Sequence, residues 1–351
     1  MDRGCGERVL SRLATKAIQL ARTIRAYVNI LVFGKDGQLG KAFKAFFSSA
    51  SSTQNVSVQY VGRSECDLSD TAALNNLLVK AKPNLIINAS AYTAVDKAET
   101  DIEMAYAINM YAPELMAKYA AEHGATFLHY STDYVFDGSK EGWYVEDDER
   151  NPLSAYGKSK AAGEIAIEKV FSKSAKGQFA IFRTSWVYGD GGNFIRTMLR
   201  LAKERDELKV IHDQQGVPTN ADWLAKVSLS LVLDTEFHIR QFASGIYHAV
   251  PAGETTWHGL AFLAIQSALD DGVVLKAKPE SIKPILAVEY PLPAPRPMNS
   301  RMDSAKLRTA LQGALLDASN SYNEPQNVPN FPSWDGMVQE YVSKLAADGL
   351  I

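Results

Sequence analysis

The sequence has few cysteines, no long uninterrupted apolar run and no block of charge of one sign. Cys5 and Cys66 are the only cysteines among 351 residues, too few for a disulfide framework, which favours a reducing cytoplasm. No segment approaches the roughly 18–20 apolar residues of a membrane span. A net charge of −3, with charged residues at 22%, provides no basic surface for nucleic acid. We therefore expect a globular protein with neither membrane nor nucleic-acid partners.

The length predicts two domains, because 351 residues exceed the roughly 100–200 typical of one domain. Residues 1–27 differ from the rest, since they are rich in arginine and nearly free of acids. Their leucines and isoleucines suggest an amphipathic helix. We expect this extension to be a helix docked on the body or a segment upstream of the true start, with a transit peptide as the alternative.

From Val28 onward, strand-like and helix-like patterns alternate. Such alternation is typical of βαβ units, so we predict an α/β fold: a Rossmann-type, doubly wound parallel sheet. We place this dinucleotide-binding domain at 28–185. The apolar strand-like runs are 28–33, 56–62, 84–90, 126–131 and 178–184, and the helical segments are 38–47, 70–81, 101–124 and 154–171.

Beyond residue 185 the alternation weakens. The stretch 291–303 is too rich in proline and too polar for a sheet core. We predict that 186–351 forms mainly a smaller, loop-rich substrate-binding domain. Two strand-like segments, near 209–211 and 245–250, are expected to return to the Rossmann sheet.

Three glycines lie between the first strand and the first helix, at Gly34, Gly37 and Gly40. Glycine allows a tight turn and lets backbone N–H groups approach a pyrophosphate at the helix N-terminus. The alternative is a glycine turn that binds no ligand, which would have the same sequence. Its position directly after the first strand of a βαβ unit favours dinucleotide binding.

The end of the second strand indicates which dinucleotide is preferred. An NAD site usually has an acid there for the ribose 2′-hydroxyl, whereas this sequence has Arg63. A guanidinium matches the oxygens of a 2′-phosphate, so we predict NADPH, with NADH as the alternative. The competing interpretation is a solvated surface arginine. Asp67 and Leu68 follow closely and are predicted to lie under the adenine.

Tyr156 and Lys160 are spaced as Tyr-x-x-x-Lys. A chain with 15 tyrosines should contain this spacing about once by chance, so the spacing alone carries little weight. On a helix, however, the two side chains share one face, and an ammonium beside a phenol lowers the pKa of the phenol. We predict that Tyr156 is an acid whose pKa Lys160 lowers.

The fourth strand supplies hydroxyl and carboxyl groups to the same region. Open α/β sheets bind ligands at the carboxyl ends of their strands, where Ser131, Thr132 and Asp133 follow "TFLHY". Thr132 beside Tyr156 would form a pair of donors for an oxygen that gains negative charge. A plain strand-end turn is the alternative for Thr132.

The motifs together resemble those of the extended short-chain dehydrogenase/reductases and, within them, the dTDP-4-dehydrorhamnose reductases. The resemblance covers the chain from Val28 to its C-terminal region. The segments that carry it are "ILVFGKDGQLG" (30–40), "NASAYTAVDKAE" (88–99), "HYSTDYVFDG" (129–138), "PLSAYGKSKAAGE" (152–164), "FRTSWVYG" (182–189), "NFIRTMLRLAKER" (193–205) and "RPMNSRMD" (296–303). The extension 1–27 departs from the family pattern.

The resemblance implies specific roles for residues. Tyr156 would be the proton donor, Lys160 would hold the nicotinamide ribose and tune Tyr156, and Thr132 would assist at the substrate oxygen. Further cofactor contacts would be Gly37, Gln38, Leu39, Asp67, Leu68, Ala89, Ala91, Tyr92, Thr93 and Tyr130.

We expect the substrate to contact Thr132 and Asp133 and residues beyond the fifth strand. Trp186 could stack on a sugar or pack in the core. Asn193 offers a polar contact, and Arg296, framed by prolines, could bind a diphosphate or be a solvated loop charge.

The implied reaction is NADPH-dependent reduction of the C4 keto group of dTDP-4-dehydro-β-L-rhamnose to dTDP-L-rhamnose. The alternatives are another nucleotide 4-keto-sugar reductase and a non-catalytic NADP-binding subunit, like the regulatory β subunit of methionine adenosyltransferase. The resemblance also suggests Mg²⁺ as a cofactor and a homodimer as the assembly. The sequence shows no metal-ligand spacing, and we interpret the acidic run 146–149 as a solvated loop.

Overall fold

A computed structural model describes residues 27–49, 56–174, 176–318 and 330–351. The predictions for the extension 1–27 lie outside these residues, apart from Tyr27 at its end.

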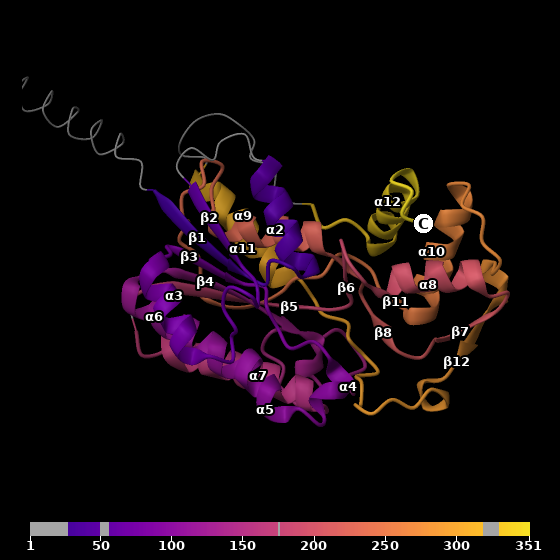
Figure 1. The fold of residues 1–351 in the computed structure, drawn as a ribbon, viewed down its shortest axis with the longest axis horizontal. Helices are drawn as coiled ribbons and strands as arrows, with labels where there is room; N and C mark the ends of the chain where they lie inside the picture. The colour runs from indigo at the N-terminus through magenta and orange to yellow at the C-terminus, as the bar shows by residue number, and fades with distance from the viewer. Residues whose placement is uncertain (1–26, 50–55, 175, 319–329) are drawn as a thin grey trace, which may run out of the picture.

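Six parallel strands form the central sheet in the order β10-β5-β4-β3-β1-β2 (Figure 1). Their bounds are β1 Val28–Phe33, β2 Val56–Val61, β3 Leu85–Asn88, β4 Thr126–Thr132, β5 Gln178–Thr184 and β10 Gly245–His248. The predicted Rossmann-type sheet is therefore confirmed, and the segment predicted at 245–250 supplies its edge strand β10. The order reverses between β1 and β3, which makes the carboxyl ends of these strands the expected place for a ligand.

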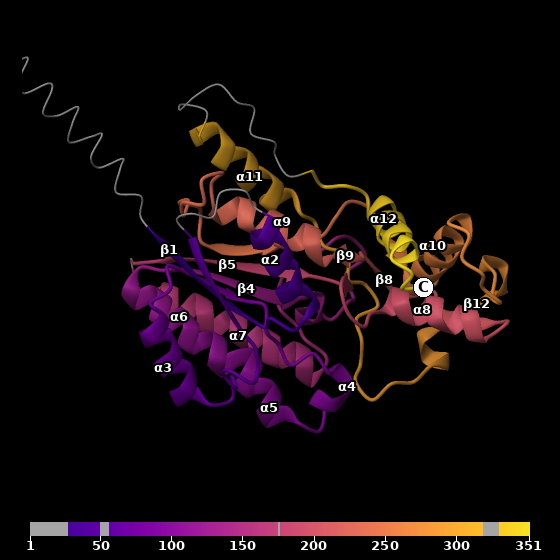
Figure 2. The ribbon, with the colours of Figure 1, turned by 45° about the horizontal axis from the view of Figure 1, so that its top comes forward.

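Helices cover both faces of the sheet, as Figures 1 and 2 show. One face carries α2 Gln38–Ser49, α9 Ala221–Val232 and α11 Ala305–Ala318; the other carries α3 Thr71–Ala81, α6 Ala112–His123 and α7 Ala155–Phe171. Alternate strand residues enter the two layers, because successive side chains of a strand point to opposite faces. In β1, Ile30 and Val32 join the core under α2 and α9, whereas Leu31 and Phe33 join the core under α3, α6 and α7.

Local signals explain where these helices begin and end. Asp70 caps α3, with Oδ1 accepting a hydrogen bond from the N–H of Ala73 at 2.9 Å, and Gly124 ends α6 with φ of 71°. The segment predicted to be helical over 101–124, with Pro113 as a break or a new start, is interrupted. It is divided into α5 Ile102–Tyr106, a π-helical segment Ala107–Tyr111 and α6, whose first turn contains Pro113.

A separate hydrophobic core lies to one side of the sheet. It is built by α8 Phe194–Glu204, α10 Trp257–Asp270 and α12 Trp334–Ala347, with β7 Leu208–Ile211 paired to β12 Ile282–Ile285. The prediction that 209–211 returns to the Rossmann sheet is wrong, because β7 forms a two-stranded sheet of its own. Its alternating pattern of burial was too short to identify the partner strand.

The proline-rich segment 291–303, which we call the strap, runs between the second core and the sheet. Ser300 donates its N–H to Gln215 O at 2.8 Å, and Gln215 donates its own to Met298 O at 2.9 Å. A Cβ atom at Gly138 would come within 2.5 Å of Met298 N, so the strap packs tightly against the chain that leaves β4. The strap thereby joins segments that are far apart in the sequence.

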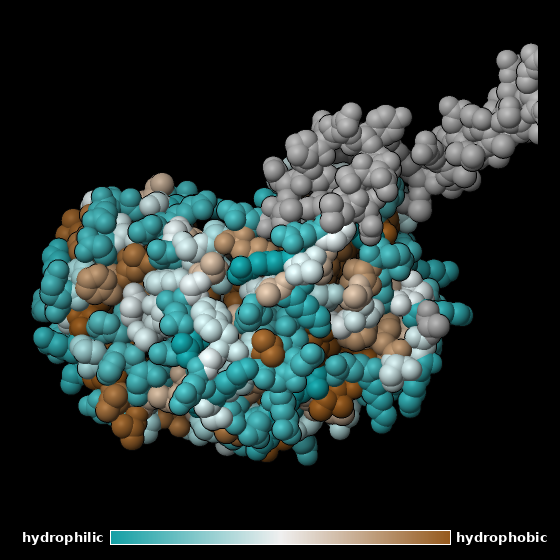
Figure 3. Space-filling model, turned by 180° about the vertical axis from the view of Figure 1, so that it is seen from behind, coloured by the Kyte–Doolittle hydropathy of each residue, from teal (hydrophilic) through white to brown (hydrophobic). Residues whose placement is uncertain are grey.

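The surface is mainly hydrophilic on the face seen from behind in Figure 3, with apolar side chains dispersed over it. Within the part of the chain that the structure describes, no helix combines the length and the apolar character needed to cross a membrane.

Candidate active site

The glycine loop has the geometry of a phosphate cradle. Gly34 has φ of 88°, and a Cβ atom there would come within 2.8 Å of the carbonyl of Ala89. A Cβ atom at Gly40 would come within 2.0 Å of Gly34 O, so α2 approaches the loop more closely than any side chain permits. The first turn of α2, with Gln38 and Leu39, has N–H groups without helical partners. These features fit the pyrophosphate of a dinucleotide.

Arg63 lies just beyond the end of β2, as predicted. Its side chain is 78% exposed, and Nε is 3.3 Å from Asp67 Oδ2. Asp67 also accepts two hydrogen bonds from Ser69, while Leu68 is buried in the core under α3. An exposed guanidinium with one weak partner is free to turn towards a ligand, since surface pairs of this kind are worth little.

The segment after β3 contains four predicted cofactor contacts, Ala89, Ala91, Tyr92 and Thr93. The N–H of Tyr92 donates to Asn109 Oδ1 at 2.9 Å, and Asn109 Nδ2 donates to Ser159 Oγ at 2.9 Å. Asn109 belongs to the π-helical segment, so this irregular turn ties the loop to α7. Sequence reasoning missed Asn109, although an interruption in a long helix is a known sign of function.

Tyr156 and Thr132 come together at the end of β4. Tyr156 is in the first turn of α7, and its ring lies edge-on against Tyr134, with centroids 5.4 Å apart. Burial raises the pKa of the Tyr156 phenol above its usual value, Asp133 adds to the rise, and a hydrogen bond with the Thr132 side chain opposes it. Tyr156 is therefore a protonated phenol at neutral pH, which is the state that a proton donor requires.

Lys160 is buried one turn further along α7. Its Nζ donates to Tyr130 O at 2.6 Å and lies 3.3 Å from His129 Nε2. Burial lowers the pKa of Lys160 to about 8, although Glu164 opposes the fall. The hydrogen bonds of this amine are thus with β4, and its tuning of Tyr156 stays a prediction.

The Tyr130 ring points away from this cluster. It packs between Phe43 and Phe182 in the core under α2, so Tyr130 can reach the cofactor side through its backbone. His129 was missed by sequence reasoning. Its Nδ1 is 3.1 Å from Asn88 Nδ2, and burial followed by the charge of Lys160 keeps its pKa well below the usual value, so the imidazole is neutral.

A buried carboxylate supports α7 behind Lys160. Glu164 accepts from Arg183 Nε at 2.9 Å and Nη2 at 2.7 Å, and from Arg150 Nε at 2.6 Å. Glu164 and Arg183 are both fully buried. Burial alone would raise the pKa of Glu164, but the two guanidinium groups hold it well below the usual range. This pair fixes α7 against β5.

Asp133 is buried beside Thr132. Its Oδ1 accepts from Thr132 Oγ1 at 2.8 Å, and its Oδ2 accepts a short hydrogen bond from Ser300 Oγ of the strap. Burial raises the pKa of Asp133 to about 6, which the two hydroxyl hydrogen bonds only partly oppose.

The raised pKa of Asp133 makes stability depend on pH. Between the usual aspartate value of 3.8 and about 6 the folded protein binds more protons than the unfolded chain, so the free energy of unfolding falls as pH rises through this window. Asp133→Asn removes the effect. Urea unfolding measures the free energy of unfolding of both proteins. The difference, variant minus wild type, should increase by about 1–3 kcal/mol from about pH 4 to about pH 7.5. An equal difference at both pH values would contradict the raised pKa.

The remaining predicted substrate contacts have different surroundings. Trp186, with φ of 48°, stacks on Trp257 at 3.7 Å and lies over Gly216, where a Cβ atom would come within 2.5 Å of the indole. Asn193 caps α8 and donates to Tyr341 Oη at 2.9 Å and Gly189 O at 3.0 Å, so its amide is engaged within the protein. Arg296 forms an ion pair with Asp96, Nη2 to Oδ2, at 2.8 Å.

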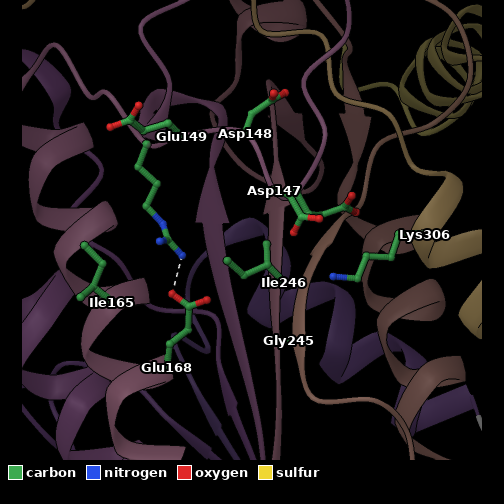
Figure 4. A pocket seen from close by; sticks show the side chains of 10 residues that line it. Asp147, Asp148, Glu149, Ile165, Glu168, Gly245, Ile246 and Lys306 are labelled. Atoms are coloured by element: carbon green, nitrogen blue, oxygen red, sulfur yellow. Dashed lines mark hydrogen bonds and ion pairs between the residues drawn. The ribbon is translucent and has the colours of Figure 1, made fainter. Parts of the chain in front are cut away.

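The acidic run 146–149 is not wholly solvated. With Lys306 and the start of β10 it lines a pocket of about 490 Å³, where Figure 4 shows the carboxylates spread around the rim. Glu146 accepts from His248 N at 2.8 Å, and Asp148 pairs with Lys140 at 2.5 Å. Among the described residues, no group of three His, Cys, Asp or Glu side chains is placed to hold a metal ion.

Comparison with known proteins gives a consistent result. The profile of the family described as "RmlD substrate binding domain" matches residues 28–321. The dTDP-4-dehydrorhamnose reductase of Shigella flexneri is 41% identical over 294 residues, which span 83% of this chain and 94% of that protein.

Solved structures extend the comparison. A dTDP-4-dehydrorhamnose reductase from Clostridium acetobutylicum superposes with a TM-score of 0.76 at 33% identity. The match covers 91% of this chain and 100% of that chain. The Bacillus anthracis dTDP-4-dehydrorhamnose reductase, solved in complex with NADP, superposes with a TM-score of 0.74 at 27% identity, covering 90% of this chain and 99% of its own.

Proposed function

We infer the reaction from one premise: this chain belongs to the RmlD substrate-binding-domain family and, within it, to the dTDP-4-dehydrorhamnose reductases. It is an NAD(P)H-dependent oxidoreductase that reduces dTDP-4-dehydrorhamnose to dTDP-rhamnose. The observation in the structure that best supports this reaction is the buried Tyr156 phenol beside Thr132 at the carboxyl end of β4, with a pKa that burial raises. The alternative of a non-catalytic NADP-binding subunit is not favoured.

The reduction converts a C=O group into a CH–OH group and consumes one hydride and one proton. The nicotinamide cofactor, when bound, supplies the hydride that is added to C4 of the sugar. We assign the proton to Tyr156, whose O–H bond breaks as the O–H bond of the product forms. The Thr132 hydroxyl, which donates to Asp133 Oδ1 in this structure, would turn to donate its hydrogen bond to the same oxygen, which stabilises the negative charge developing there. Lys160 would hold the ribose of the cofactor.

The cofactor cradle would be formed by the glycine loop and the loops that follow β2 and β3. Gly34, Gly37 and Gly40 with the first turn of α2 suit the pyrophosphate, and the segment Ala89–Thr93 lines the next strand end. Nothing among the described residues indicates a magnesium site. A cytoplasmic location and a homodimer stay predictions.

We propose that Arg63 selects NADPH over NADH. Arg63→Ala should raise KM for NADPH about tenfold and leave KM for NADH unchanged, because only the 2′-phosphate would lose its charge-assisted hydrogen bonds. Steady-state kinetics with both cofactors measures this. Arg205→Ala, which removes an exposed arginine at the end of α8, is the matched control. An unchanged preference in Arg63→Ala would disprove the assignment.

The reaction is tested by incubating the protein with NADPH and dTDP-4-dehydrorhamnose and following NADPH absorbance and the sugar product. Parallel reactions with other 4-keto-sugar nucleotides, including UDP-linked ones, test the substrate. No NADPH consumption with any 4-keto sugar nucleotide would refute the assignment as an enzyme, and faster consumption with a different nucleotide sugar would correct the substrate.

A further inference from the structure

Lys160 has a buried side-chain partner to which the proposed reaction gives no role. Its Nζ lies 3.3 Å from His129 Nε2 and donates to Tyr130 O at 2.6 Å. His129 in turn lies close to Asn88, with Nδ1 and Nδ2 3.1 Å apart. Asn88 and His129 are completely buried and Lys160 is 1% exposed, so water does not replace these contacts. Each donor in this cluster therefore needs an acceptor from the protein.

The hydrogen-bond network assigns the position of the imidazole proton. Ser90 N donates to Asn88 Oδ1 at 3.2 Å, which directs the amide NH₂ group of Asn88 towards His129. An amide nitrogen is only a donor, so His129 Nδ1 accepts. The imidazole is neutral, because burial, followed by the charge of Lys160, holds its pKa well below the usual value. Its one proton is therefore on Nε2.

This tautomer determines which form of Lys160 fits the cluster. The Nε2–H group of His129 is a donor, and it faces Lys160 Nζ. An ammonium group has three donors and no acceptor, whereas a neutral amine has a lone pair that can accept. The chain of hydrogen bonds from Ser90 N to Tyr130 O therefore has a donor and an acceptor at every step only when Lys160 is a neutral amine.

Tyr156 and Glu164 are the titratable neighbours of Lys160 on α7, one turn to either side. Burial lowers the pKa of Lys160 to about 8, and Glu164 opposes the fall. Glu164 is itself paired with Arg183 of β5 and with Arg150, and burial raises the pKa of the Tyr156 phenol. A hydrogen-bond donor that faces the amine disfavours its charged form. The imidazole thus acts in the same direction as burial.

We propose that Asn88 and His129 are positioning residues for Lys160: Asn88 fixes the imidazole tautomer whose Nε2–H donates to the lysine amine, and this contact sets the pH at which Lys160 loses its proton. The inference rests on the proposed function, in which Lys160 holds the cofactor beside Tyr156. A charged Lys160 stabilises the phenolate that remains when Tyr156 has given up its proton. Loss of the proton from Lys160 therefore sets the alkaline limit of the reaction.

The substitution that tests this is Asn88→Leu, which keeps the imidazole but removes the donor that fixes its tautomer. The ring proton can then move to Nδ1, and His129 Nε2 can accept from a charged Lys160. Because the lysine then stays charged to higher pH, the alkaline fall of kcat/KM for NADPH, which reports the free enzyme, should move upwards. The expected shift is about 0.5–1 pH unit, the scale of one hydrogen bond. Asn75→Leu, at an exposed asparagine of α3, is the matched control and should leave the profile unchanged.

The tautomer can be read directly, without any substitution. Nitrogen NMR spectra of the isotope-labelled, cofactor-free full chain, with His129 assigned from its backbone, distinguish protonated from unprotonated ring nitrogens. Nε2 should carry the proton at both about pH 7 and about pH 9, on either side of the titration of Lys160. The pH dependence of the Nε2 signal follows that titration, and its midpoint should rise in Asn88→Leu by the same amount as the kinetic limit.

A proton on His129 Nδ1 in the wild type would overturn the proposal, whether or not Asn88→Leu folds. A limit that moves to lower pH in Asn88→Leu would also overturn it, because His129 would then accept from the ammonium group. An unchanged limit would do the same. Failure of the reaction is distinguishable: a protein with the Nε2–H tautomer and the expected shift in the NMR titration, but without reduction of any 4-keto sugar nucleotide, supports the role of Asn88 and refutes the reaction.

Discussion

Replacing Tyr156 with phenylalanine should lower kcat about 1,000-fold, within the range measured for loss of a general acid. The phenol is the group that the site keeps protonated, through burial and the neighbouring Asp133. Phenylalanine preserves the ring and its edge-on contact with Tyr134 at 5.4 Å, so the loss is confined to the proton. Turnover of dTDP-4-dehydrorhamnose, followed by NADPH absorbance, measures the effect.

Two measurements separate the loss of a proton donor from general damage. Fluorescence of bound NADPH should show affinity retained to within about tenfold, the scale of one hydrogen bond. Tyr119→Phe removes a phenol from α6, where the ring stacks on His123, and should leave kcat within about twofold because no transition-state contact is lost. If Tyr156→Phe retains most of its kcat, another group delivers the proton.

Replacing Arg183 with methionine should have the largest effect on stability, about 3–5 kcal/mol of the free energy of unfolding. Arg183 and Glu164 are fully buried, and the guanidinium makes two hydrogen bonds to the carboxylate. Methionine leaves Glu164 buried with Arg150 alone, so the carboxylate loses much of its compensation. Urea unfolding followed by circular dichroism measures the change.

A matched substitution on the surface shows how much stability is lost when an exposed ion pair is broken. Arg200→Met breaks a pair with Glu204 at 3.0 Å, but both partners are more than half exposed, so the cost should stay below about 1 kcal/mol. The double variant Glu164→Gln, Arg183→Met should recover part of the loss, because the uncompensated charge is gone. Equal costs for Arg183→Met and Arg200→Met would contradict the role given to burial.

Local spacing accounts for what the sequence could predict. The glycine loop and the Tyr156–Lys160 pair each lie within a few residues of one strand end or helix start. Their geometry can therefore be predicted from the local sequence alone. The six parallel strands follow from the same local alternation. The family resemblance added the roles of the residues, most of which no local pattern could assign.

Contacts between distant segments account for what the sequence could not predict. Asp96 and Arg296 are 200 residues apart, and no spacing rule relates them. Asn88 and His129 belong to different strands, β3 and β4, so only the folded sheet shows that they meet beside Lys160. Asn193 was predicted to face substrate because it follows the fifth strand, yet its amide is used to cap α8.

The hydrogen bond from Ser300 to Asp133 has a consequence for how the protein is made. The two residues are 167 positions apart, and β1 to β5 are all synthesised well before Ser300 leaves the ribosome. Domains form largely from the N-terminus during translation, and long-range contacts close last because they cost more loop entropy. A nascent chain can therefore assemble the central strands while the carboxylate next to Thr132 still lacks its partner. The contact between the strap and the carboxylate beside Thr132 can form only after the strap has been synthesised.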